Sequence, residues 1–160
     1  MRSIDIRPGD LDDSRVVEPL ERHARIARSH TAEGSAHSLD VDAFRSPDLS
    51  LWTAWDDGEL AGVAALKRHA GRLGELKSMH TVEATRRRGV AGALLARIVE
   101  QARAAGVSRL CLETGSWDFF APARAFYERC GFTPCAPFAD YKPDPNSVFM
   151  ALALEDEADS

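Results

Sequence analysis

With 160 residues, of which 44% are hydrophobic and 28% charged, the chain has the composition of a single globular domain and not of a disordered protein. The formal net charge of −5 excludes the global basic field that draws proteins to nucleic acid. No stretch approaches the roughly 18 apolar residues of a membrane span, and the N-terminus lacks an apolar segment of signal-peptide length, so we expect a cytoplasmic protein without a membrane partner.

The cysteines indicate neither a disulfide framework nor a metal site. Cys111, Cys130 and Cys135 are odd in number and lie in or beside apolar segments, which favours reduced thiols. Because neither CxxC nor HxxxH spacing occurs, no metal is expected. We expect one domain over residues 1–154, followed by an acidic tail over 155–160.

The N-terminal third predicts one strand and two helices. Alternating side chains predict a strand over residues 3–7, and apolar residues at helical spacing predict a helix over 12–29. Asp12 or Asp13 is available as the cap of this helix. Residues 31–38, rich in Gly, Ser and His, predict a loop, and 39–44 predict a short second helix.

The middle of the chain predicts three strands and the longest helix. Strands over residues 49–55 and 60–68 are joined by Asp57-Gly58, a strong hairpin signal. A third strand follows over 75–82. Residues 89–105 carry one apolar stripe at helical spacing, and Gly106 ends this helix.

The last third predicts a strand over residues 109–113, a helix over 122–130 and two strands, around 132–138 and 147–154. The predicted order is therefore β-α-α-β-β-β-α-β-α-β-β. This order indicates an α/β fold with a mixed sheet, antiparallel in its N-terminal half and parallel where the long helix crosses over.

A glycine-containing turn with three arginines opens the long helix directly after a strand. The string is RRRGVAG over residues 86–92. Free N–H groups and the helix dipole at such a start favour an anion, glycine permits its close approach, and arginine adds charge-assisted contacts. A phosphate or pyrophosphate fits best. The alternative is a solvated arginine run before an ordinary amphipathic helix.

Two motifs carry a family resemblance. Arg86-x-x-Gly89-x-Ala91 resembles the Q/R-x-x-G-x-G/A signature of the GCN5-related N-acetyltransferase (GNAT) superfamily, in the same place between the fourth strand and the third helix. The string AFYERCGF over residues 125–132 resembles that family's second signature. Residues 75–79 and 112–115 look similar to YsnE-like bacterial members. The resemblance covers residues 49–154 and implies a GNAT-like fold in which the fourth and fifth strands splay apart at a bulge.

The resemblance implies acetyl-CoA as the co-substrate, held mostly by backbone groups. The N–H groups of residues 88–93 would bind the pyrophosphate, with Arg87 or Arg88 reaching a phosphate. The pantetheine arm would pair with the fourth strand like an added strand. The implied cofactor-binding residues are His80, Thr81, Val82, Arg87, Arg88, Gly89, Val90, Ala91, Gly92 and Ala93.

The implied reaction is attack of an amine on the thioester carbonyl, which needs a base for the amine and a proton for the leaving thiolate. The resemblance places the hydroxyl of Tyr127 near the sulfur as the proton donor; the alternative is a packed aromatic bonded to a backbone carbonyl. Glu75 is the candidate base; the alternative is a strand-end charge paired with Lys77 or Arg72. Glu113 and then His80 are the next candidates for the base.

Acceptor recognition is less determined. In this superfamily the N-terminal helices and their loop wall the acceptor site, so Ser35 and His37 are candidate contacts. Residues 117–120 form either an apolar lid or part of the core. Candidate carboxylate-binding cations are Arg68, Lys77 and Arg124.

Acetylation of a primary amine on a small molecule or amino-acid-like metabolite is the first functional hypothesis. The alternatives are a protein N-terminal or lysine acetyltransferase, a non-catalytic CoA sensor, and a nucleotide-binding domain of another class. Family members are often dimers, and the exposed edges of the late strands offer a surface for one.

Overall fold

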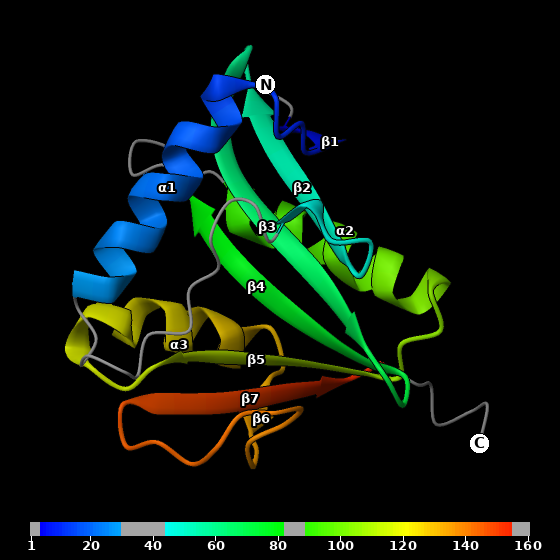
Figure 1. Cartoon of the computed structure of the whole chain (residues 1–160), viewed down its shortest axis with the longest axis vertical. Coiled ribbons are helices and arrows are strands. Elements are labelled where there is room, and N and C mark those ends of the chain that lie inside the picture. The colour runs from blue at the N-terminus through cyan, green and yellow to red at the C-terminus, as the bar shows by residue number, and fades with distance from the viewer. Residues whose placement is uncertain (1–3, 30–43, 82–88, 155–160) are drawn as a thin grey trace.

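The computed structural model describes residues 4–29, 44–81 and 89–154. The strands in these ranges form one seven-stranded sheet in the order β1-β2-β3-β4-β5-β7-β6 (Figure 1). The strands are β1 (Ile4–Pro8), β2 (Leu49–Asp56), β3 (Glu59–His69), β4 (Leu73–Thr81), β5 (Arg109–Gly115), β6 (Thr133–Pro134) and β7 (Ser147–Ala153). The helices are α1 (Ser14–Ser29), α2 (Val90–Ala104) and α3 (Ala121–Arg129), with a short 3-10 turn, η3 (Asp118–Phe120).

The predicted mixed α/β fold is confirmed. The sheet is antiparallel from β1 to β4, and β4 and β5 form the parallel pair that the α2 crossover predicts. The loop predicted over residues 31–38 and nearly all of the helix predicted over 39–44 lie outside the described residues, as does the tail over 155–160.

The hairpin between β2 and β3 follows from its turn residues. Asp57 and Gly58 both have positive φ, 53° and 83°, which is the backbone of a two-residue turn that matches the twist of the strands it joins. The turn aligns Asp56 with Glu59, and the β2–β3 register then shifts once, between Ala54 and Trp55.

Each face of the sheet has its own apolar cluster. On one face, α2 and α3 cover residues such as Leu66, Leu76, Leu110 and Leu112, with α2 behind the strands in Figure 1. On the other, α1 covers part of β2 and β3 through a second cluster: Val16, Leu20, Phe44, Leu49, Leu51, Trp55, Val63 and Ala65. Beside it on this face, a third cluster centred on Phe138 and Phe149 covers β5 and β7.

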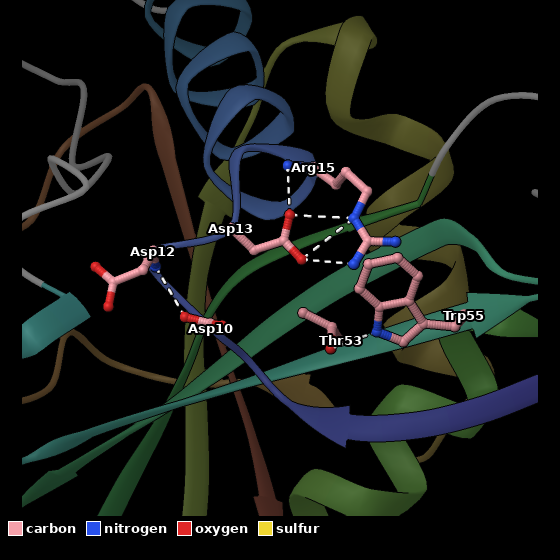
Figure 2. Close-up of polar contacts among 6 residues, drawn as sticks. All are labelled: Asp10, Asp12, Asp13, Arg15, Thr53 and Trp55. Carbon is pink, nitrogen blue, oxygen red and sulfur yellow. Dashed lines mark hydrogen bonds and ion pairs between the residues drawn. The ribbon is translucent and has the colours of Figure 1, made fainter.

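The start of α1 is held by a capping aspartate and a stacked arginine (Figure 2). Asp13 Oδ1 accepts the N–H of Arg15 at 2.9 Å, which confirms Asp13 as the cap. The Arg15 guanidinium bonds back to the Asp13 carboxylate at 2.7 Å and lies 4.6 Å from the ring centroid of Trp55. Trp55 in turn donates to Thr53 Oγ1 within β2, so the Arg15–Trp55 contact joins the start of α1 to an indole that β2 holds in place.

The parallel pairing between β4 and β5 stops after four residues. Leu73–Leu76 pair with Arg109–Leu112, and beyond this point β4 follows β3 to Thr81 while β5 follows β7 to Gly115. The β3–β4 register shifts opposite Ala64, where β4 contains one extra residue. The two strands thus part just before this bulge, and the expected splay is confirmed.

One late strand is much shorter than predicted. Instead of spanning residues 132–138, β6 covers only Thr133–Pro134. Just beyond it, the N–H of Cys135 still donates to Phe149 O at 2.9 Å. In an antiparallel ladder every second residue donates to the neighbouring strand, so the next donor would be Pro137, which has no N–H. The prediction was wrong because the ladder with β7 cannot continue past this proline.

Gly115, at the end of β5, packs against the segment that leads into α3. A Cβ there would lie 2.1 Å from Cδ2 of Phe120. We expect Gly115→Ala to reduce the free energy of unfolding by about 1–3 kcal/mol, as overpacking does, measured by urea denaturation. Gly92→Ala is the matched control, because its Cβ would meet nothing within 4 Å. An unchanged urea midpoint for Gly115→Ala would contradict this packing.

Candidate active site

The start of α2 presents backbone amides to an open space. Gly89 is its N-cap, in the left-handed region at φ 79°, and no side chain caps the helix. The amide of Ala93 donates to Gly89 O at 3.0 Å, so the amides before it, from Val90 to Gly92, have no partner within the helix. A Cβ at Gly89 or Gly92 would meet nothing within 4 Å. Such a turn fits a bulky anion.

Gly62 of β3 brings the end of β4 and the start of α2 together. A Cβ at Gly62 would lie 3.0 Å from each of three atoms, on His80, Val90 and Leu94. Thr81 pairs with Gly62, and the fully buried Val90 anchors the helix start. The predicted cofactor-binding residues His80, Thr81 and 89–93 therefore lie next to one another, whereas Val82, Arg87 and Arg88 lie outside the described residues.

Tyr127 of α3 lies in the apolar cluster on the α2 face, with 8% of its surface exposed. Its ring makes edge contacts with Phe126 and Phe132. Among the described residues its hydroxyl has no hydrogen-bond partner, so the backbone carbonyl of the alternative interpretation is not found there. Burial raises the pKa of Tyr127 well above its usual value, so the hydroxyl keeps its proton at neutral pH.

Glu75 of β4 lies on the opposite face of the sheet and is 2% exposed. Its Oε1 lies 2.9 Å from His69 Nε2, and its Oε2 accepts bonds from Lys77 Nζ at 3.1 Å and from the Tyr141 hydroxyl at 2.6 Å. Lys77 Nζ also donates to the Tyr141 hydroxyl at 2.9 Å. These four side chains form one buried polar network, which we call the Glu75 network.

The Glu75 network contains the pairing that the sequence left as an alternative for Glu75, together with two residues that it missed. Lys77 is the partner, whereas Arg72 donates to Gly106 O instead. Tyr141 lies in the loop between β6 and β7, so no local spacing links it to Glu75. His69 lies on β3 two residues after Lys67, which pairs with Glu75, so the register of the β3–β4 hairpin brings His69 beside Glu75. The role of Glu75 as the base stays a prediction.

Glu113 of β5 is the second carboxylate on this face. It is the first residue after Leu112, where the pairing with β4 ends, and it lies opposite Phe149 of β7. Burial raises the pKa of Glu113 to about 7. The positive charge of Lys77 opposes this rise, and the negative charge of Glu75 adds to it.

The three cations predicted as candidate carboxylate receivers are all bonded within the fold. Arg68 donates to Ser50 Oγ and Pro47 O, Lys77 belongs to the Glu75 network, and Arg124 donates to Gly115 O and Trp117 O. Candidate contacts Ser35 and His37 lie outside the described residues.

The aromatic residues expected as either a lid or part of the core lie largely at the surface. Trp117 is 40% exposed and Phe119 is 47% exposed. Trp117 Nε1 donates to Asn146 Oδ1 at 2.8 Å, which ties this segment to the loop before β7.

Residues 17–132 match the sequence profile of the Acetyltransferase (GNAT) family. The chain belongs to this family. It is 44% identical over 149 residues to the uncharacterized N-acetyltransferase YsnE of Bacillus subtilis, covering 93% of this chain and 99% of YsnE. It is 38% identical over 152 residues to IAA acetyltransferase of Azospirillum brasilense, covering 92% and 95% of the two chains.

The fold of this GNAT protein is also that of solved acetyltransferases. A Bacillus subtilis acetyltransferase in complex with CoA superimposes with a TM-score of 0.67 at 19% identity, over 94% of this chain and 99% of that one. The protein is thus a YsnE-like, acyl-CoA-dependent N-acetyltransferase. None of the helices in the described segments is long and apolar enough to span a membrane.

The left-handed turn at Gly89 generates a prediction about CoA. Alanine at this φ costs about 1–2 kcal/mol and disturbs the amides that follow, so we expect Gly89→Ala to weaken CoA binding at least about tenfold, measured by isothermal titration calorimetry. Gly71→Ala is the matched control: Gly71 has φ 76°, also has open space around its Cβ, and lies in the β3–β4 turn. Equal losses of affinity in both variants would contradict the role of the α2 start.

Proposed function

We propose that this protein transfers the acetyl group of acetyl-CoA to the primary amine of a small molecule or amino-acid-like metabolite by direct attack. The observation that carries the proposal is the parting of β4 and β5 after Leu76 and Leu112. The α2 start and Tyr127 lie on one face of the sheet, and Glu75 and Glu113 on the other. An opening between the strands lets a thioester held on one face meet an amine held on the other.

The donor site is proposed to be built from backbone groups. The amides of residues 88–93 bind the pyrophosphate, helped by Arg87 or Arg88, and the pantetheine arm pairs with His80, Thr81 and Val82. The support is the close packing of the β4 end on the α2 start around Gly62. In the transfer, the amine nitrogen forms a bond to the carbonyl carbon, the C–S bond breaks, and the Tyr127 hydroxyl gives its proton to the sulfur.

On the acceptor side, we propose that a carboxylate takes a proton from the amine. Glu75 and Glu113 are the two candidates, because both lie on the face opposite Tyr127 beside the point where the strands part. Since both are acidic, they also favour an acceptor that arrives as an ammonium ion.

The burial of the Glu75 network supports a small acceptor over a protein tail. The side chains of Glu75, Lys77 and His69 are 3%, 9% and 19% exposed. The ring of Tyr141 makes contacts with Phe138 and Phe149, and these three aromatic side chains cover the Glu75 network on one side. A peptide in an open groove would need more of this face to be accessible, whereas a small amine would need only the point beside Glu113 where β4 and β5 part.

A cytoplasmic location is part of the proposal. The support is that Cys111, Cys130 and Cys135 are all free thiols, as is usual in a reducing compartment.

The proposed function is tested by incubating the protein with acetyl-CoA and a panel of amines while free thiol is followed. We expect amine-dependent thiol release and a rise in melting temperature with acetyl-CoA, because a ligand that binds only the native state stabilises it. Acetylated peptides from a lysine and N-terminal peptide panel, with no product from any small amine, would favour a protein acceptor. If the protein shows no thiol release with any amine and no thermal shift with acetyl-CoA, the acetyltransferase proposal is refuted.

Tyr127→Phe tests the proton donor. Loss of the hydroxyl should lower kcat by about 10²–10³, since a general acid contributes on this scale, while the acetyl-CoA Kd stays unchanged. The measurements are steady-state kinetics and calorimetry on the same preparation, with the melting temperature as the folding control. Unchanged turnover would show that Tyr127 only packs against Phe126 and Phe132.

A further inference from the structure

Glu113 stands at the point where β4 and β5 separate. Leu112 is the last β5 residue paired with β4, so at Glu113 the β4 side of the strand is no longer covered by a ladder. Its other neighbour, β7, continues to pair through Phe149. Because Glu113 and Cys111 are two residues apart, they share the face on which Cys111 lies opposite Glu75. The Glu113 carboxyl is therefore the acidic group nearest along β5 to the opening.

Glu75 is poorly placed to exchange a proton with an acceptor. Both of its oxygens have partners, since His69 lies on Oε1 and both Lys77 and Tyr141 lie on Oε2. An amine that displaced one of these partners would leave a buried charge without compensation. Glu113 is different: within the described chain, no cation lies at ion-pair distance from it.

The charges around Glu113 suit a proton acceptor at neutral pH. Desolvation is the main cause of its raised pKa of about 7, and Glu75 on β4 and Asp144 in the β6–β7 loop raise it further. Lys77 on β4 acts in the opposite direction. Tyr141 faces the same group and keeps its own proton, because burial and Glu75 raise its pKa far above neutrality. A base whose pKa lies near the working pH can both take and release a proton.

We propose that Glu113 accepts the proton of the acceptor amine and that Glu75 acts as a positioning residue, which holds Lys77 and Tyr141 beside it. This rests on the proposed acetyl transfer. An N–H bond of the ammonium breaks, its proton goes to a Glu113 oxygen, and the electron pair left on nitrogen forms the C–N bond. The C–S bond breaks, its electron pair leaves with the sulfur, and the sulfur takes the Tyr127 proton. The nitrogen then loses its second proton, which returns to Tyr127 through solvent. Glu113 finally releases its own proton to solvent.

The pH dependence of Glu113→Gln tests this role. Without the base, the reaction depends on the fraction of amine that is already neutral in solution, and this fraction rises about tenfold per pH unit below the amine pKa. In the wild type, Glu113 is ionised above pH 7 and can take the proton from the bound ammonium. We expect kcat/KM of Glu113→Gln to fall about 10²-fold or more at pH 7, and the loss to shrink as the pH approaches the amine pKa. Glu100→Gln, at a side chain 72% exposed on α2, is the control and should match the wild type.

Glu75→Gln separates the two carboxylates. A positioning role predicts a smaller loss of kcat/KM that stays constant with pH, together with a lower melting temperature from disruption of the Glu75 network. If Glu75→Gln instead shows the loss that shrinks at high pH, and Glu113→Gln does not, the assignment is reversed and the proposal is overturned. In that case thiol release by the wild type would still stand, so acetyl transfer itself would not be in question.

A titration of the wild type covers the case in which a variant does not fold. With ¹³C-labelled glutamate, one side-chain carboxyl should titrate near pH 7, and it should be absent from Glu113→Gln if that variant folds. Because the pKa of Glu113 is raised to about 7 in the folded state, the protein loses stability as the pH rises from the ordinary glutamate pKa through 7. Glutamine carries no charge at either pH, so the melting temperature of Glu113→Gln relative to the wild type should be higher at pH 8 than at pH 5. If every glutamate of the wild type titrates below pH 6, the proposal is overturned.

Discussion

The structure depends on how a single parallel ladder ends. Four residue pairs hold β4 to β5, after which β4 stays with β3 and β5 stays with β7. A sheet normally satisfies its backbone groups by continuing its ladders, and parted strands leave such groups for another partner. The proposed partner is the pantetheine arm, which would take the place of the missing strand. A break in the ladder and a binding site are, on this view, the same feature.

The break persists because the rest of the fold holds both halves firmly. On the α2 side, Val90 and Leu94 pack against β3 at Gly62 with no space for another carbon. On the α1 side, the Asp13–Arg15–Trp55 arrangement fixes the helix to β2 (Figure 2). Beyond the break, Phe138 and Phe149 pack on β5 and β7. On the α1 face each half has its own apolar cluster, and on the α2 face one continuous cluster joins the two halves, so the sheet stays together without further β4–β5 pairs.

Features set by neighbours in the chain could be predicted from the sequence. The Asp57-Gly58 turn, the α2 helix and its Gly89 start depend on local backbone preferences, and the structure has all three. The length of β6 was overestimated because its apolar residues were weighed without the missing N–H group of Pro137. Of the Glu75 network, the sequence offered only the pairing of Glu75 with Lys77. Tyr141 could not be predicted, since it reaches Glu75 across 66 positions of sequence through tertiary packing alone.

The loop that carries Tyr141 lies between β6 and β7, near the edge of the sheet rather than in its middle. A segment of this kind accepts insertions and exchanges of residues more readily than a central strand. The proposed donor site relies on backbone amides, which nearly every residue possesses, whereas the proposed acceptor face would rely on individual side chains such as Tyr141. Evolution could therefore give this scaffold a new acceptor by altering one peripheral loop, with the grip on CoA inherited unchanged.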